Sequence, residues 1–193
     1  MVIGITGGFG SGKSLAGTFW AEWGAFRVDT DAIARQILEG DERAREEVRQ
    51  AFGSEVLRKD GGISRERLAQ VVFGCPEKLQ KLENILHPPI RQGWEEAIAQ
   101  ASPAVKVVEI PLLFEKKLEL CFNFVVCISV SLTTQLARLK AAGWTESEVH
   151  ARNARQMPLA EKVKLADYVI SNNGSIEFTR QQVFLLAGRL NLI

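Results

Sequence analysis

The sequence predicts an α/β fold: a three-layer sandwich in which a parallel five-stranded sheet lies between layers of helices, extended by a helical insert and a lid. Short apolar runs alternate with longer helical patterns, which is the order that right-handed crossovers between parallel strands produce. The short runs are apolar almost throughout, as is typical of strands covered on both faces. Residues 31–102, in contrast, contain no strand pattern, which indicates an insert made of helices.

Five short segments carry the strand pattern. Each consists mainly of β-branched or other apolar residues, and the strongest of them, Phe-Val-Val-Cys-Ile-Ser-Val, begins at Phe124. The expected strands are residues 2–6, 26–29, 105–110, 124–130 and 168–170.

Helices are expected between and after these strands. One follows the first strand, two follow the fourth, and one closes the chain after the Asn172-Asn173-Gly174 turn; they are residues 14–23, 133–142, 145–156 and 175–190. The insert carries five helical patterns, which Gly61-Gly62 and Pro88-Pro89 punctuate. They are residues 31–38, 41–52, 64–73, 76–86 and 90–101.

Composition limits the classes of function. The 193 residues carry 24 basic and 23 acidic side chains, a net charge of +1, so the chain lacks the basic surplus that nucleic-acid binding favours. No apolar run approaches the ~20 residues of a membrane helix, and the first residues show no signal-peptide pattern. We therefore expect a cytoplasmic protein without a nucleic-acid or membrane partner, and the sequence, which does not determine the oligomeric state, favours a monomer.

The three cysteines do not form a metal or disulfide pattern. Their number is odd, no Cys-x-x-Cys pair occurs, and both histidines lie far from them in the sequence. Cys121 and Cys127 flank or lie within an apolar run, which predicts small buried side chains.

The strongest functional signal is a glycine-rich loop near the start of the chain. Residues 7–14, Gly-Gly-Phe-Gly-Ser-Gly-Lys-Ser, match the phosphate-binding pattern G-x-x-x-x-G-K-[ST] between a strand and a helix. The glycines let backbone N–H groups surround an anion, and the helix start adds its own N–H groups and positive dipole end. An ordinary strand-to-helix turn is the alternative, which the position directly after a strand disfavours. We predict that the phosphates of ATP contact Gly8, Gly10, Ser11, Gly12, Lys13 and Ser14.

The last two residues of this loop, Lys13 and Ser14, have distinct expected roles. Lys13 would reach the β- and γ-phosphates and stabilise the transferring group. The hydroxyl of Ser14 would bind Mg²⁺. Together they predict a nucleotide-binding fold of the P-loop NTPase type.

Two carboxylates end the second strand. Because the carboxyl ends of parallel strands line the ligand crevice, Asp29 and Asp31 are expected to face the loop. A hydroxyl that attacks ATP needs a carboxylate to accept its proton, and Mg²⁺ prefers oxygen ligands. We assign Asp31 as the base and Asp29 as the holder of a magnesium-bound water, while the reverse assignment stays open. A further alternative is that Asp31 caps the helix that follows.

Basic residues after the fourth strand predict a lid at about residues 138–157. Arg138 is the candidate cation that closes over the phosphates, and Gly143 the candidate hinge. A solvated helix face is the alternative for such arginines. Glu115, which ends the third strand segment, would contact Mg²⁺ or position the loop. The predicted division is a nucleotide-binding core (1–30 and 103–193), an acceptor-binding insert (31–102) and the lid.

These segments together resemble the dephospho-CoA kinase family over nearly the whole chain. The resemblance rests on the loop, on Val28-Asp29-Thr30-Asp31 with Ala34-Arg35, and on His87-Pro88; it continues in Pro111-Leu112-Leu113-Phe114-Glu115, Gln156-Met157-Pro158-Leu159 with Lys162, and Ala166-Asp167-Tyr168-Val169-Ile170 with Asn173-Gly174. It implies ATP-dependent phosphorylation of the ribose 3′-hydroxyl of dephospho-CoA, the last step of coenzyme A synthesis. It also implies that Gly10 to Leu15 line the ATP phosphates, that Asp31 meets this hydroxyl, and that Arg35 and His87 lie in or beside the acceptor region.

The chain departs from the family pattern at three places. Leu15 replaces the usual Thr, and Phe9 replaces a more usual Ile. In the lid, Ala141-Ala142-Gly143-Trp144 stands where the family tends to have an Arg-Asp pair. We therefore expect one lid cation to be missing, which would affect the rate of turnover more than the type of reaction.

Three alternative functions remain at the level of the sequence. A P-loop kinase for another small hydroxyl acceptor, such as a nucleoside or metabolite, would share the loop and the acidic pair. A regulatory NTPase switch is disfavoured because the Asn-Lys-x-Asp tetrapeptide of guanine-specific switches does not occur. An inactive CoA-binding protein is disfavoured because Lys13, Ser14, Asp29 and Asp31 are all present.

Overall fold

The computed structural model describes residues 1–73 and 75–190. The chain divides into two compact units, Met1–Asp29 with Gln100–Ile193 and Thr30–Ala99. The first unit contains the sheet and the glycine-rich loop, and the second consists of helices and a short connecting segment.

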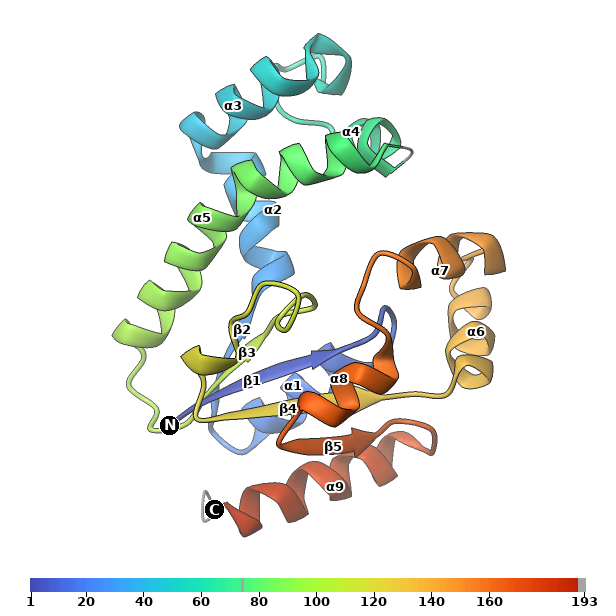
Figure 1. The fold of residues 1–193 in the computed structure, drawn as a ribbon. Coiled ribbons are helices and arrows are strands. Elements are labelled where there is room, and N and C mark those ends of the chain that lie inside the picture. The colour runs from blue at the N-terminus through green and yellow to red at the C-terminus, as the bar shows by residue number, and fades with distance from the viewer. Residues whose placement is uncertain (74, 191–193) are drawn as a thin grey trace. The chain divides into compact units, whose positions relative to one another are not determined.

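The sheet of the first unit has five strands in the order β2-β3-β1-β4-β5, and every neighbouring pair is parallel (Figure 1). Their bounds are β1 Val2–Gly7, β2 Phe26–Asp29, β3 Lys106–Glu109, β4 Phe124–Ser129 and β5 Tyr168–Ser171. The predicted parallel α/β sheet is therefore confirmed. Each expected strand is present, with ends that differ by one residue or fewer.

The strand register brings several strand ends to one edge of the sheet. Asp29 of β2 pairs with Glu109 of β3, and Glu109 pairs in turn with Ile5 of β1. Because all the strands are parallel, the glycine-rich loop that follows β1 begins at the same edge as Asp29.

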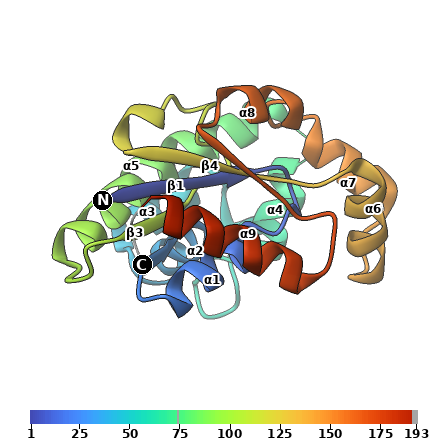
Figure 2. The same cartoon turned by 90° about the horizontal axis from the view of Figure 1, so that it is seen from below.

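Helices cover both faces of this sheet. Figure 2 shows the strands between α8 (Leu159–Leu165) on one side and α1 (Lys13–Glu22) with α9 (Ile176–Arg189) on the other. The core between α1, α9 and the sheet is apolar: Ile3, Ile5, Ala16, Phe19, Trp20, Val107, Val126, Ile128, Ile170, Val183, Leu186 and Ala187. Burial of such side chains is the main favourable term in folding.

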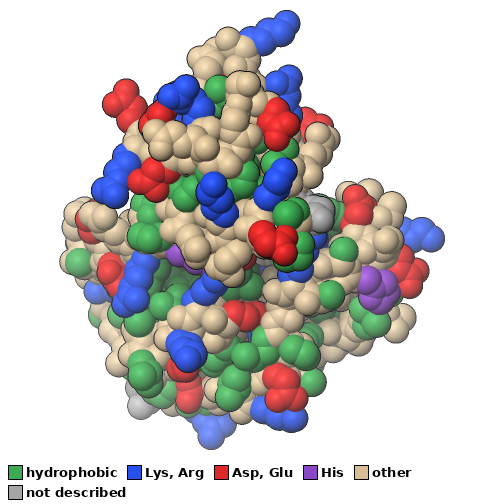
Figure 3. Space-filling model, turned by 45° about the horizontal axis from the view of Figure 1, so that its top comes forward, with side chains coloured by type: hydrophobic (Ala, Val, Ile, Leu, Met, Phe, Trp, Pro, Cys, Tyr) green, Lys and Arg blue, Asp and Glu red, His purple; other side chains and the backbone are tan. Residues whose placement is uncertain are grey.

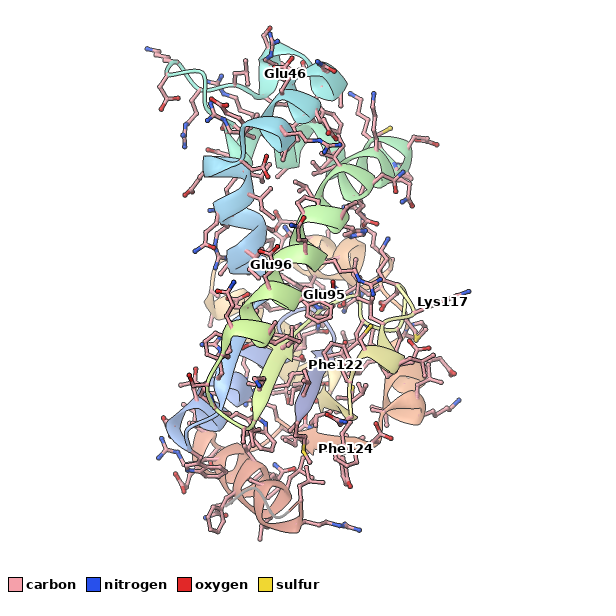
Figure 4. All side chains as sticks on the ribbon, turned by 90° about the vertical axis from the view of Figure 1, so that its left-hand side faces the viewer. Glu46, Glu95, Glu96, Lys117, Phe122 and Phe124 are labelled. Carbon is pink, nitrogen blue, oxygen red and sulfur yellow. The ribbon has the colours of Figure 1, made fainter. Side chains whose placement is uncertain are left out.

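The segment between β3 and β4 packs directly on β1. A Cβ atom added at Gly4 would lie 2.7 Å from Leu113 Cδ1 and 2.9 Å from Phe122 Cδ2, so a larger residue at this strand position would require these side chains to shift. Figure 4 shows Phe122 against the strands.

The region predicted as one helix at 145–156 differs from that prediction. Helix α7 spans Glu146–Asn153 and begins with a capping box in which Thr145 and Glu148 bond reciprocally. The chain then turns, and α8 begins after Pro158. The sequence prediction did not include α8, because the turn depends on a tertiary bond: the N–H of Met157 donates to Glu115 Oε1 at 2.8 Å.

The second unit contains four helices within its described residues: α2 Thr30–Gly40, α3 Glu42–Phe52, α4 Arg65–Phe73 and α5 Pro76–Gln100. A second apolar cluster holds them together: Leu38, Val48, Phe52, Val56, Ile63, Leu68, Val72 and Leu86. The helices thus bury a core separate from that of the sheet.

Helix α5 corrects the prediction of two helices separated by Pro88-Pro89. Both prolines lie inside one helix of 25 residues. Proline lacks the N–H that would bond four residues back, so it removes two helical hydrogen bonds without unwinding the chain here. The ribbon changes direction partway along α5 (Figure 1), as prolines within helices commonly cause. Packing of Leu86 and Ile90 against the apolar cluster supports the helix on both sides of the pair.

The cysteine prediction holds for one of the two residues. Cys127 of β4 is buried, whereas Cys121 is exposed, so its prediction was wrong. Cys121 lies in a short 3₁₀ turn, Glu119–Cys121, ahead of β4, and the apolar run that suggested burial begins only after it. Burial raises the pKa of the Cys127 thiol to about 11, against the opposing charges of Lys162 and Lys13.

We expect a thiol reagent at pH 8 to modify Cys121 readily and to leave Cys127 intact in the folded protein. With a pKa of about 11, about one Cys127 thiol in a thousand is ionised at pH 8, and only the thiolate reacts. Mass spectrometry after timed labelling checks this, with labelling in denaturant as the control that makes all thiols reactive. Equal labelling rates for both residues in the folded protein would contradict it.

The surface carries both signs of charge. Figure 3 shows acidic and basic side chains interspersed over the visible face, which matches the net charge of +1. Among the described residues, no helix combines the length and the hydrophobicity needed to cross a bilayer.

Candidate active site

The glycine-rich loop connects β1 to α1, the context that a phosphate-binding loop requires. Gly10 and Gly12 have φ of 63° and 93°, in the left-handed region that favours glycine. The N–H of Ser11 donates to the Gly8 carbonyl at 3.2 Å, which closes the loop on itself. Helix α1 begins at Lys13, so its unpaired N–H groups point toward the loop.

Lys13 lies over the loop that precedes it. Its Nζ donates to the carbonyl of Gly8 at 3.0 Å and to that of Gly7 at 3.5 Å. Ser14 is exposed, and Leu15 packs against the sheet core. Thus the Lys13 ammonium lies on the loop side, Ser14 is open to solvent, and Leu15, which departs from the family pattern, serves packing.

Two side chains that the sequence analysis did not assign bind the loop backbone. Gln135 of α6 (Leu132–Ala141) donates to the Phe9 carbonyl, and Asn172 after β5 donates to the Ser11 carbonyl at 2.8 Å. From the sequence, Asn172 is expected only as a residue of the turn after the last strand. The signal for it was its place after the last strand, at the edge of the sheet where the loop begins.

Phe9 also contacts the predicted lid. Its ring meets Trp144 edge to face at 5.1 Å between centroids, and the Arg152 guanidinium lies 4.9 Å and 4.5 Å from the two ring centroids. Cation–π attraction to the two rings stabilises the guanidinium in this position. Burial, and then the nearby Arg155, lower the pKa of Arg152. Two of the departures from the family pattern, Phe9 and Trp144, are therefore in contact.

Arg138, the predicted lid cation, bonds to the turn after β5. Its guanidinium donates to the carbonyls of Asn172 at 2.7 Å and Gly174 at 3.0 Å. Gly143, the predicted hinge, has φ of 89° and follows the end of α6. Contact of Arg138 with a phosphate and hinge motion at Gly143 stay predictions.

The acidic pair and the predicted acceptor residues occur in different units. Asp29 ends β2 in the first unit, whereas Asp31, Arg35 and His87 belong to the second. Helix α2 begins at Thr30, so Asp31 lies in its first turn rather than at its N-cap. In this position the positive end of the helix dipole stabilises the negative charge of its carboxylate.

Two of the acceptor residues share one helix face. Asp31 and Arg35 are one turn apart on α2, a spacing that places side chains on the same side. His87 lies on α5, and the two helices pack closely, since a Cβ atom at Gly93 would lie 3.0 Å from Ile33 Cγ2.

Glu115 forms a buried ion pair. Its Oε1 accepts from Lys162 Nζ at 2.8 Å and from the Met157 N–H, while Lys162 also donates to the Pro111 carbonyl at 2.6 Å. The Lys162 side chain is fully buried and that of Glu115 is 18% exposed. The pair joins α8 to the segment after β3; the predicted contact of Glu115 with Mg²⁺ stays a prediction.

Replacing Lys162 by methionine is expected to destabilise the protein by about 3–5 kcal/mol, because it leaves the Glu115 carboxylate buried without its partner. Lys164 is the matched control: it lies on the same helix, its side chain is 70% exposed, and Lys164→Met should change stability by no more than about 0.5 kcal/mol. Denaturant unfolding of both variants measures the difference. Equal midpoints would contradict a stabilising role for the buried pair.

The predicted magnesium ligands are oxygen donors in the first unit. The Ser14 hydroxyl and the Asp29 carboxylate suit Mg²⁺, which uses few protein ligands and completes its shell with water and phosphate oxygens. Among residues 1–73 and 75–190, no group of three or more His, Cys, Asp or Glu side chains is arranged to hold a metal ion.

Comparison with known proteins gives a consistent result. A family model described as dephospho-CoA kinase matches residues 1–177. A dephospho-CoA kinase from Bacillus cereus is 41% identical over an alignment that covers 100% of this chain and 98% of the relative.

Solved structures agree with the sequence relatives. A Thermus thermophilus protein, TT1252, superposes with a TM-score of 0.84 at 34% identity and covers 98% of this chain and 97% of its own. Dephospho-CoA kinase from Campylobacter jejuni superposes with a TM-score of 0.71 at 27% identity, covering 98% and 96% of the two chains.

Proposed function

The chain belongs to the dephospho-CoA kinase family, and we propose that it transfers the γ-phosphoryl group of ATP to the ribose 3′-hydroxyl of dephospho-CoA, giving coenzyme A and ADP. The observation that carries this proposal is the family match over residues 1–177, within which the phosphate-binding loop is complete. The protein is accordingly a transferase of coenzyme A synthesis.

The loop would bind the phosphates of ATP. Residues Gly8 to Leu15 would surround them, and Lys13 would stabilise the charge that develops on the transferring group. Support comes from the position of Lys13 Nζ over the loop, within hydrogen-bond distance of the Gly8 carbonyl. Arg138 would act as a further cation near the phosphates.

Asp31 would accept the proton of the acceptor hydroxyl. The ribose oxygen then bonds to the γ-phosphorus while the bond from that phosphorus to the β,γ-bridging oxygen breaks, and ADP leaves. Arg35 and His87 would bind the acceptor. Support comes from the shared face of Asp31 and Arg35 and from the place of Asp31 directly after the strand that ends in Asp29.

Ser14 and Asp29 would hold Mg²⁺, Asp29 through water, with Glu115 as a further candidate. The metal ion neutralises phosphate charge when it is bound. The remaining predictions are a core at 1–30 and 103–193, an acceptor-binding insert at 31–102, a lid at about 138–157, a cytoplasmic location and a monomeric state.

A direct assay tests the function. Purified protein is mixed with Mg·ATP and dephospho-CoA, and both ADP and coenzyme A are followed by chromatography. Adenosine and shikimate serve as parallel acceptors, with a control that lacks acceptor. Coenzyme A formed only with dephospho-CoA is the expected result; ADP formation with another acceptor instead would overturn the substrate while retaining the kinase.

A further inference from the structure

Two carbonyls of the phosphate-binding loop are held by side-chain amides from distant parts of the chain. Gln135 of α6 donates to the Phe9 carbonyl, and Asn172 donates to the Ser11 carbonyl at 2.8 Å. Both amides are buried, with 5% of Gln135 and 3% of Asn172 exposed. A buried hydrogen bond to a loop this short constrains the orientation of individual peptide groups.

The effect on the loop follows from the planarity of the peptide bond. In a trans peptide, the carbonyl of one residue and the N–H of the next point in opposite directions. Holding the Phe9 carbonyl therefore aims the Gly10 N–H away from Gln135, and holding the Ser11 carbonyl aims the Gly12 N–H away from Asn172. N–H groups of such a loop are the donors that bind phosphate.

The orientation of the Asn172 amide is set by a neighbour. Thr179, fully buried on α9, donates its hydroxyl to Asn172 Oδ1 at 2.9 Å, so Nδ2 faces the loop. The backbone of Asn172 is held on both sides: its N–H donates to the Ser129 carbonyl at 2.7 Å, and its carbonyl accepts from Arg138 at 2.7 Å.

Gly12 allows this contact. Its φ of 93° favours glycine, and a Cβ atom there would collide with Asn172 Nδ2. The glycine of the motif therefore has a second use in this chain, which is to admit the amide that holds the preceding carbonyl.

Gln135 connects the loop to the predicted lid. Its Oε1 accepts from Asn153 Nδ2 at 2.9 Å, and its Nε2 donates to Asn153 Oδ1 at 3.1 Å. Asn153 is the last residue of α7. The Phe9 carbonyl requires a donor, so the nitrogen of Gln135 is the atom that faces the loop.

We propose that Gln135 and Asn172 are positioning residues for ATP: they keep the Phe9 and Ser11 carbonyls turned away from the phosphates and the adjoining N–H groups turned toward them. Neither side chain reacts, and each acts through the loop backbone. This inference rests on the ATP-binding part of the proposed function.

The test compares Asn172→Asp and Gln135→Leu with the unaltered protein. Asn172→Asp keeps the shape and replaces the donor by an acceptor, and Gln135→Leu keeps most of the volume and removes the donor. Gln181→Glu, an exposed amide on α9 with the same change of charge, is the control. Calorimetry measures the Kd of Mg·ATP without acceptor, kinetics give the KM of dephospho-CoA, and thermal unfolding reports stability.

We expect each variant to bind Mg·ATP about tenfold more weakly, since a carbonyl is left without its donor. The KM of dephospho-CoA should stay within about twofold, because the altered carbonyls belong to the ATP-binding loop and not to the acceptor region. Gln181→Glu should match the unaltered protein, because Gln181 lies on α9, outside the loop. The loss of Mg·ATP affinity in Asn172→Asp should also become smaller as the pH falls, because a protonated carboxyl again donates to the Ser11 carbonyl. A purely structural role would lower the unfolding temperature without this pH dependence.

Folded variants that bind Mg·ATP as tightly as the unaltered protein would overturn the proposal. If Asn172→Asp does not fold, Gln135→Leu and the milder Thr179→Val, which removes the hydroxyl that orients Asn172, decide the matter. Because ATP affinity is measured without acceptor, failure of the unaltered protein to form coenzyme A would refute the proposed function and leave this test valid.

Discussion

Replacing Lys13 by alanine is expected to slow coenzyme A formation by about a thousandfold, because a positioned cation stabilises the charge of the transferring phosphoryl group in a site shielded from water. Lys13 Nζ lies over the loop, 3.0 Å from the Gly8 carbonyl. Steady-state kinetics with dephospho-CoA at several ATP concentrations measure the loss of kcat and of kcat/KM.

Lys164→Ala is the matched control for this experiment. It removes the same charge from an exposed position, 70% accessible, and should retain the activity of the unaltered protein. Circular dichroism establishes that the Lys13→Ala protein is folded. A folded Lys13→Ala protein with activity within tenfold of the control would refute the assignment of the loop as the catalytic phosphate site.

Replacing Asp31 by asparagine is expected to lower kcat by about two to four orders of magnitude, because general-base catalysis contributes that much and an amide cannot accept the proton. The Kd of Mg·ATP should stay unchanged, since Asp31 lies on α2, outside the loop. Rapid-quench measurement of a single turnover separates this chemical step from product release.

Two comparisons sharpen the assignment of Asp31. Glu39→Gln alters an exposed carboxylate near the end of the same helix and should have no effect. Asp29→Asn should instead weaken the binding of Mg·ATP and recover activity at higher Mg²⁺ concentration, if Asp29 holds magnesium-bound water. Weakened ATP binding with intact turnover in Asp31→Asn would mean that the two carboxylates have exchanged roles.

The parts of the fold that were predicted well depend on local patterns. The five strands appear within one residue of their expected ends. A continuous apolar run bounded by polar residues is buried on both faces when it forms a strand of a parallel sheet covered by helices, so its ends follow from the sequence. The same holds for the loop, whose glycines and Lys13 require the strand-to-helix context that the structure contains.

The errors occurred where a distant residue decides the local conformation. Helix α5 passes through Pro88-Pro89 because it packs on the apolar cluster on both sides of the pair. The chain turns before α8 because Met157 bonds to Glu115, which is 42 residues away. Cys121 is exposed because the chain enters β4 only after it.

The parallel sheet, the phosphate-binding loop and the family follow from the amino-acid sequence alone, since each depends on the order and type of nearby residues. Only the tertiary structure revealed that Gln135 and Asn172 hold the loop from 126 and 161 residues away, that Arg138 holds the turn after β5, and that Lys162 is paired with Glu115. The physical reason is that a buried polar side chain must find its partner in space, and the fold alone decides which residue is within reach.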